Sequence, residues 1–294
     1  MVNGKRLLFF DILRIVAVTA VVYSHIIMFQ GIIPRPEDLL VFNFVYYGIG
    51  IVGVYILLFV SGAVLEYSYP NLNTFDDIVN FYFRRLTRIY PAYWISILIG
   101  LALSPLILVQ YSPFNIFLEF TGFYTWSGRW APPINPIGWF IGLIVALYFL
   151  FPFISLAIKK HPYITLTTVA FVEIFLRIYF NVVHPAAFGM LPDRWFPVCS
   201  LMEFGLGIFI IQQGFYPKNF ISPGWVAFLG DFSFYVFLAH CYPGFKFIVV
   251  SVSLPLYLIE VVLMAGLIML GDLWVQKKIG ASLSRISEIT DNTT

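Results

Sequence analysis

The sequence predicts an all-α fold, a polytopic bundle of transmembrane helices. Hydrophobic residues make up 60% of the 294 positions and charged residues only 11%, and the mean hydropathy is +0.88. A soluble domain of this length could not cover its surface with so few charges. Several apolar runs are long enough to cross about 30 Å of hydrocarbon. We therefore expect a protein whose main partner is the lipid bilayer. No basic run points to nucleic acid.

About eight segments are expected to span the bilayer. In chain order they are Leu7–Met28, Asn43–Leu65, Tyr90–Val109, Ile137–Ile158, Pro162–Val182, Phe196–Gln213, Gly224–Gly244 and Ser253–Trp274. Phe114–Trp126 is too short to cross and contains Glu119, so we expect it to be a re-entrant or interfacial segment. The predicted transmembrane domain covers residues 1–276, and residues 277–294 form a short cytoplasmic tail.

The N-terminus superficially resembles a secretory signal peptide, because Lys5 and Arg6 precede an apolar run. Asp11 and Arg14 interrupt that run, however, and no small-residue cleavage site follows it. We therefore expect a first helix that is retained.

The basic residues predict the orientation. With the N-terminus inside, eleven would lie in inner loops and tails: Lys5, Arg6, Arg84, Arg85, Arg88, Lys159, Lys160, Lys218, Lys277, Lys278 and Arg285. Four would lie outside: Arg35, Arg129, Arg194 and Lys246. This bias predicts a multi-pass protein of the cell membrane with both termini cytoplasmic. Tryptophan belts would then lie near the inner surface (Trp94, Trp225, Trp274) and the outer surface (Trp126, Trp130, Trp195).

The first predicted helix has a polar stripe. Arg14 and His25 are eleven positions apart, about 16 Å or three turns along a helix, and share nearly the same face with Asp11. An arginine at the centre of a membrane helix costs at least about 2.5 kcal/mol, which favours the wall of a polar cavity. The alternative is that Asp11 neutralises Arg14 at i,i+3 and that His25 is interfacial.

An arginine-rich segment, residues 84–91, is expected in the second loop. Arg85 and Arg88 are three positions apart and would face the same way on a helix. Two guanidinium groups on one face suit a phosphate, which arginine binds through two hydrogen bonds. The alternative is a topology signal that meets anionic lipid headgroups, but lysine would serve that role equally well.

A second histidine, His240, is expected near the outer end of its span, at about the depth of His25. The two could line one cavity, or His240 could be a hydrogen-bonded structural residue. Cys199 and Cys241 lie in apolar stretches without metal-ligand spacing. We expect packing thiols and no metal.

Other ionisable residues interrupt the apolar segments. Glu173 and Arg177, four apart, are expected to neutralise each other. Glu203 and Glu260 have no partner within their own helices and are candidates to line a pore. Two acidic residues close to the inner surface are expected to be solvated: Asp231 and Asp272. Ser61-Gly62, with Gly53 before it, would provide either close helix packing or room for a narrow ligand.

In order along the chain, these motifs resemble the acyltransferase-3 family of membrane O-acyltransferases, which modify cell-surface carbohydrates. The similar segments are Phe10–Arg14 through His25, Gly53–Val54 through Ser61-Gly62-Ala63, Arg84–Pro91, Asn135–Ile141 with Trp139 and ending in Tyr148 and Pro152, and Leu229–His240. The chain departs from the family pattern at Tyr55 (usually aspartate), Leu57 and Leu58 (usually phenylalanines) and Ile144 (often glutamate). It is also two spans shorter than the usual ten.

The resemblance implies an enzyme that takes an acyl group, acetyl above all, from acetyl-CoA on the cytoplasmic side. The acceptor would be a hydroxyl of a cell-surface or lipid-linked carbohydrate reached from the outer side. Arg14, Arg85 and Arg88 would bind the donor, and His25 would act as general base or as an acyl-histidine nucleophile. Four further residues would support the substrates: Asp11, Ser61, Trp139 and His240. The alternative function is a transporter or exporter of lipid-linked sugar or polysaccharide, although no repeated halves are found.

Overall fold

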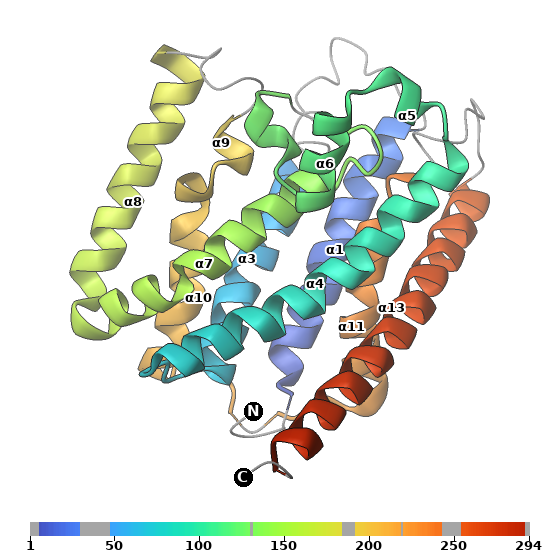
Figure 1. Ribbon diagram of the computed structural model, residues 1–294. Coiled ribbons are helices and arrows are strands. Elements are labelled where there is room, and N and C mark those ends of the chain that lie inside the picture. Colours follow the sequence, from blue (N-terminus) through green and yellow to red (C-terminus); the bar gives the residue numbers. More distant parts are fainter. Residues whose placement is uncertain are drawn as a thin grey trace.

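The computed structural model describes residues 6–29, 48–129, 132–183, 192–218, 220–242 and 254–291. These residues form a bundle of helices (Figure 1), and their only β pairing is an isolated bridge between Leu7 and Ile221. The all-α prediction is confirmed. The first residues of α1 and the last of α13 lie at one end, called the lower end here as in Figure 1.

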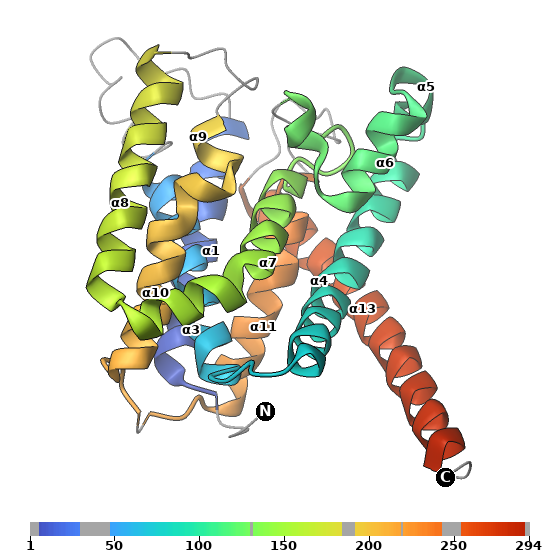
Figure 2. The same ribbon diagram turned by 60° about the vertical axis from the view of Figure 1, so that its left-hand side comes forward.

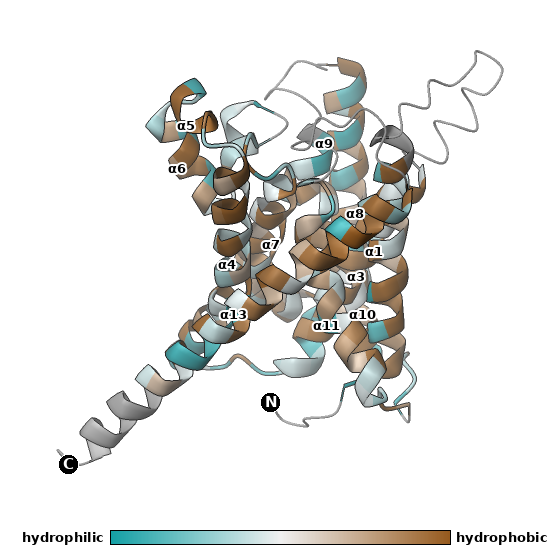
Figure 3. Cartoon of the chain, turned by 90° about the vertical axis from the view of Figure 1, so that its right-hand side faces the viewer, coloured by the Kyte–Doolittle hydropathy of each residue, from teal (hydrophilic) through white to brown (hydrophobic). Residues whose placement is uncertain are grey.

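Six helices are long and apolar enough to cross a membrane, so the chain is a multi-pass membrane protein. They are α1 (Leu8–Phe29), α3 (Gly50–Ser68), α4 (Phe75–Leu103), α7 (Gly138–Lys160), α8 (Pro162–Ile178, continued by the π-helical turn η4, Tyr179–Val183) and α13 (Leu254–Asp291). Two shorter apolar helices complete the bundle, α10 (Leu201–Gln213) and α11 (Gly224–Ala239). The eight expected spans thus comprise six long helices and two short ones. Hydrophobic residues predominate along the helices (Figure 3), and many large apolar side chains are exposed.

The segment expected to be interfacial is a short helix at the upper end. This helix, α6 (Pro113–Thr121), follows the single turn α5 (Ile107–Gln110) and precedes the 3-10 turn η3 (Tyr124–Ser127) (Figure 2). Ser112 caps its N-terminus and Gly122, at φ +82°, ends it. The buried Glu119 carboxylate accepts hydrogen bonds from the backbone N–H groups of Ile134 and Asn135. Glu119 therefore fixes α6 to the segment before α7. Two further turns lie at this end, α9 (Pro192–Trp195) and η5 (Pro197–Ser200).

The arginine-rich segment lies within α4 and not in a loop, which corrects the sequence prediction. A capping box starts this helix: Thr74 Oγ1 accepts from Asp77 N (3.1 Å) and Asp77 Oδ2 accepts from Thr74 N (3.0 Å). Because α4 begins at Phe75, Trp94 lies at the upper end, where its indole N–H donates to the Phe120 carbonyl at 2.9 Å. Its expected place in the inner belt is therefore wrong.

Helix α13 continues past Trp274 without a break and ends at Asp291. Its last turns extend beyond the other helices at the lower end (Figures 2 and 3). The tail expected after residue 276 is thus a direct continuation of the last membrane helix as far as Asp291.

Glycines allow α3 to approach both α1 and α10. A Cβ added at Gly53 would lie 2.6 Å from the Ala17 carbonyl oxygen, and one added at Gly62 would overlap the Phe204 carbonyl. Backbones this close leave no space for a ligand at either position. The glycines of α3 therefore serve helix packing, one of the two alternatives that the sequence left open.

Candidate active site

A cavity of about 350 Å³ opens at the lower end between α1, α3, α4, α7 and α11. Its mouth is polar and its walls become apolar with depth. It is lined by five residues singled out from the sequence: Asp11, Arg14, Ser61, Arg85 and Arg88. Folding therefore gathers residues from three helices around one space.

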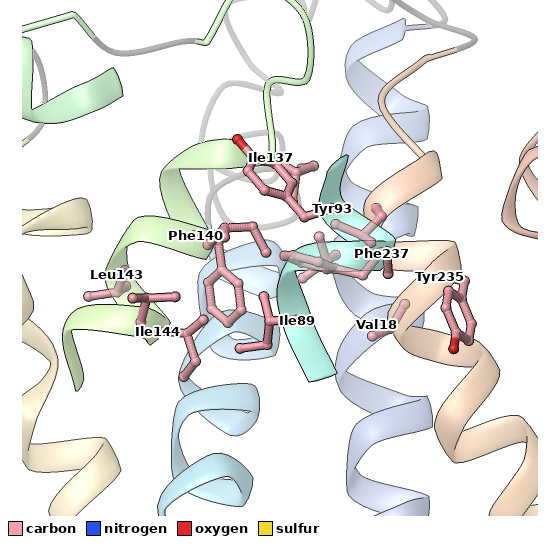
Figure 4. Close-up of a cluster of buried hydrophobic side chains, with 14 of the residues drawn as sticks. Val18, Ile89, Tyr93, Ile137, Phe140, Leu143, Ile144, Tyr235 and Phe237 are labelled. Atoms are coloured by element: carbon pink, nitrogen blue, oxygen red, sulfur yellow. The ribbon is translucent and has the colours of Figure 1, made fainter. Parts of the chain in front are cut away.

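The upper part of the cavity is closed by apolar side chains. Val18, Ile89, Phe140 and Phe237 come from α1, α4, α7 and α11 and all line the cavity. They belong to one buried cluster (Figure 4), in which the rings of Phe140 and Phe237 lie 4.9 Å apart, edge to face. These contacts form a dry partition above the charged mouth.

Ion pairs link the helices at the mouth. Asp11 accepts from Arg14 at 3.0 Å, so the i,i+3 neutralisation considered from the sequence is confirmed. Arg6 connects Asp11 and Asp231, each at 2.5 Å, and thereby joins the start of α1 to α11. Partial burial alone would lower the pKa of Arg6, but the two carboxylates raise it above its ordinary value. Arg6 therefore stays cationic at the mouth.

Arg88 extends this network to α13. It lies 3.1 Å from Asp231 and 3.8 Å from Asp272. Asp231 is partly exposed, but Asp272 is fully buried and accepts hydrogen bonds from Tyr235 (2.7 Å) and Gln276 (3.2 Å). The expectation that Asp272 is solvated is wrong, because neighbouring donors replace the water.

Arg85 has the fewest polar partners of the four arginines that line the cavity. Its guanidinium lies 4.7 Å from the centre of the Tyr69 ring, and its buried Nε has no hydrogen-bond partner among the described residues. Such an unpaired buried donor has a free-energy cost that an anion in the cavity would remove. The neighbouring Arg84 is exposed and does not line the cavity.

Above Asp11, the cavity contains Arg14 and two hydroxyl groups. These hydroxyl groups belong to Tyr148 on α7 and Ser61 on α3, and both residues line the wall. Ile144 lines the same wall as an apolar side chain.

The two histidines lie together at the upper end, beyond the aromatic partition. The rings of His25 and His240 are 4.8 Å apart and nearly perpendicular. Phe237 lines the cavity and its ring lies 5.6 Å from that of His240. The structure thus brings the histidines together, as the sequence suggested, but neither lines the cavity that holds the arginines.

Both imidazoles are oriented by backbone carbonyls. His25 Nδ1 lies 2.9 Å from the Val21 oxygen, and His240 Nδ1 lies 2.7 Å from the Phe237 oxygen. A carbonyl only accepts, so Nδ1 carries the proton in both rings, and Nε2 of a neutral imidazole is the acceptor nitrogen. His240 is fully buried and its Nε2 has no partner within the described part of the chain. His25 is half-buried, which makes it the more accessible base.

Cys241 adjoins the histidine pair. The possible ligand atoms of His25, His240 and Cys241 all lie within 4.8 Å of one another, so these residues could hold a metal ion. Sequence spacing could not reveal this group, because His25 is far from the other two along the chain. Cys241 and Cys199 are both buried and free, as expected, but the place of Cys241 beside two histidines differs from the expectation that it has no metal-ligand neighbours.

Several other singled-out residues lie outside the cavity. Trp139 packs edge-on against Phe140, with ring centres 5.8 Å apart. Glu173 and Arg177 form the expected ion pair at 2.9 Å. Arg177 also lies 3.7 Å from Glu203, so Glu203 faces α8 and does not line the cavity. Glu260 does not line it either. The partner of Glu203 on another helix could not be known from the sequence, and a buried carboxylate oxygen of Glu260 has no hydrogen-bond partner among the described residues.

Sequence reasoning missed Arg6 and Tyr148 as cavity residues. From the sequence, Arg6 is only one of the basic residues that predict the orientation in the membrane. Tyr148 is only the end of the segment that contains Trp139. The alternation of basic and acidic residues around the start of α1 was the available signal for Arg6.

Comparison with family models identifies the chain as similar to a known domain. A family model described as an acyltransferase domain matches residues 7–290, nearly the whole chain. No curated protein and no solved structure matches the sequence.

Proposed function

Because this chain belongs to the acyltransferase-3 family and is therefore a membrane acyltransferase, we propose that it is an O-acetyltransferase. The donor is acetyl-CoA, which enters the cavity from the cytoplasmic side. The acceptor is a hydroxyl of a cell-surface or lipid-linked carbohydrate, which arrives at the histidine end. The observation that supports this assignment best is the placement of Arg14, Arg85 and Arg88 around one cavity below the histidine pair.

Arg85 and Arg88 bind the phosphates of the donor at the mouth. Their planar guanidinium groups donate paired hydrogen bonds to phosphate oxygens. The unpaired Arg85 Nε supplies a donor that is not already engaged. Arg14 lies deeper, held by Asp11, and its charge faces the path of the flexible arm.

The acyl arm extends upward along the apolar wall. Arg14 and His25 are separated by about 16 Å along α1, a distance suited to a long, flexible arm. Phe140 and Phe237 lie between the cavity and the histidines, so the arm reaches His25 only when these two rings move aside. Their rings exclude water, which protects the thioester from hydrolysis until the acceptor is present.

His25 acts as the general base. Its Nε2 removes the proton from the acceptor hydroxyl while the oxygen attacks the thioester carbonyl carbon. The tetrahedral intermediate then collapses, the carbon–sulfur bond breaks, and the coenzyme thiolate receives the proton from the imidazolium. His240 positions His25 through the perpendicular ring contact. A neutral imidazole can accept the proton at Nε2 and give it up again in the next step, which suits both proton transfers.

The function is tested by giving the purified protein acetyl-CoA with a radiolabelled acetyl group and a membrane extract, and following the label. We expect the label in a carbohydrate or glycolipid fraction, in an ester that mild alkali cleaves. A transporter would instead move glycolipid in the absence of CoA, and its flux would not respond to acetyl-CoA. Label that stays in acetyl-CoA or appears only as free acetate would contradict the proposal.

A further inference from the structure

A second cavity lies beside the first at the lower end. It has a volume of about 440 Å³ and lies where α3, α7 and α10 end. Tyr67 lines both cavities, and the Tyr69 ring that follows it packs under Arg85. The two spaces are therefore neighbours, separated by the last turn of α3 and the residues after it.

The second cavity has an unsatisfied acceptor in its wall. Gln212 donates its side-chain N–H to the Ser155 carbonyl at 3.1 Å, and this contact fixes which end of the amide is oxygen. Its Oε1 is buried and has no donor among the described residues. Buried amide oxygens in proteins are nearly always paired. A ligand with an N–H group would supply the missing donor.

A buried ion pair stands next to Gln212. Glu66 is 2% exposed, accepts from the Ser155 hydroxyl at 2.6 Å and lies 3.3 Å from Lys159 Nζ. Lys159 also donates to the Pro70 carbonyl and remains partly exposed. The lysine can therefore contact an anion in the cavity while it keeps the Glu66 carboxylate neutralised.

The opposite wall is aromatic. The rings of Tyr67 and Tyr216 are 5.9 Å apart and meet edge to face. Lys218 Nζ lies 5.4 Å from the centre of the Tyr216 ring. A flat ring can pack against such a surface, next to the Lys218 ammonium group that lies over the Tyr216 ring.

We propose that this cavity binds the 3′-phosphoadenosine end of the acyl donor. The exocyclic amino group of adenine donates to Gln212 Oε1, the purine packs against Tyr67 and Tyr216, and the phosphate contacts Lys159 and Lys218. The pyrophosphate then lies at Arg85 and Arg88, and the acyl arm occupies the first cavity. This inference rests on the proposed function, because it divides the same donor between two neighbouring cavities.

The test compares two donors, acetyl-CoA and acetyl-4′-phosphopantetheine, which lacks the nucleotide. We expect the wild type to prefer acetyl-CoA in kcat/KM. Gln212→Leu should lower kcat/KM for acetyl-CoA by about 3- to 10-fold, the value of one hydrogen bond, and leave that for the truncated donor unchanged. A folding defect would lower both rates together, so the ratio of the two isolates recognition. Gln213→Leu, at the exposed neighbouring position, is the matched control and should change neither rate.

A second measurement uses adenosine 3′,5′-bisphosphate as a competitive inhibitor. It should inhibit the wild type and the Gln213→Leu variant equally, and Gln212→Leu and Tyr216→Leu more weakly. Equal use of both donors by the wild type, or an unchanged donor ratio in Gln212→Leu, would overturn the inference and leave the proposed function intact. Failure of the wild type to transfer acetyl from either donor would instead overturn the proposed function.

Discussion

The two ends of the candidate site differ in how their polar groups are satisfied. At the lower end, Arg6, Arg14 and Arg88 are each paired with an aspartate, and Asp231 bridges two of them. At the upper end, His25 and His240 contact each other, and the Nε2 of His240 has no partner in the part of the chain that is described. The lower end is open and charged, whereas the upper end is largely buried.

This difference separates binding from chemistry. Charges near water can exchange partners at little free-energy cost, because exposed ion pairs contribute only about 0–1 kcal/mol. A phosphate can therefore replace an aspartate at the mouth. Imidazoles held away from water by Phe237 have fixed tautomers and a low local dielectric, which suits proton transfer. If the two ends act separately, a change at one end should leave the role of the other end intact.

Removal of the His25 imidazole should have the largest effect. His25→Ala is expected to lower kcat by about 10²- to 10⁴-fold, the usual loss for a general base, while acetyl-CoA binding stays close to that of the wild type. Steady-state rates and equilibrium binding of the donor measure the two effects. His161→Ala, at an exposed turn between α7 and α8, is the matched control. Wild-type rates in His25→Ala would exclude His25 as the base.

Changes at Arg85 and Arg88 should affect binding rather than chemistry. Either alanine variant is expected to raise the KM for acetyl-CoA about 10-fold or more, since each removes charge-assisted hydrogen bonds. Arg85→Lys should be nearly as harmful as Arg85→Ala, because an ammonium group cannot donate the paired bonds. Arg84→Ala, at the exposed neighbour, should leave KM unchanged. A double alanine variant that binds acetyl-CoA like the wild type would refute the assignment.

His240→Ala is expected to be milder than His25→Ala. Loss of the ring contact allows His25 to rotate, so kcat should fall by about 10-fold with little change in the donor KM. The pH dependence of kcat is the informative measurement. If His240 only positions His25, its loss changes how well His25 acts as the base, but His25 remains the group that takes the proton. A loss as large as that in His25→Ala would assign proton transfer to His240 as well.

The smallest effect is expected at the mouth. Asp231→Asn removes the carboxylate that competes with donor phosphates for Arg6 and Arg88. Donor affinity should therefore rise about 2- to 5-fold at low ionic strength, and less in high salt, as for other exposed ion pairs. Titration of acetyl-CoA at two salt concentrations measures the change. Weaker binding would mean that Asp231 holds the arginines in place and does not compete with the donor.

Local signals in the sequence allowed much of the fold to be predicted. Long apolar runs predict membrane helices because the bilayer requires about 20 apolar residues for each span. The Arg14–His25 spacing placed both residues on one face of α1. The start of α4 was missed, although Thr74 and Asp77 form a capping box, because the charged first turns of this helix resemble a loop in hydropathy.

The sequence by itself therefore determined the helices, their polar faces and the residue types suited to phosphate binding and proton transfer. Only the tertiary structure decided which faces meet. The pairing of His25 with His240, the bridging role of Arg6 and the partner of Glu203 all depend on contacts between helices that are far apart in the chain. The physical reason is that periodicity fixes the direction of a side chain about its own helix axis, whereas the close packing of glycine-bearing helices fixes the neighbour it finds there.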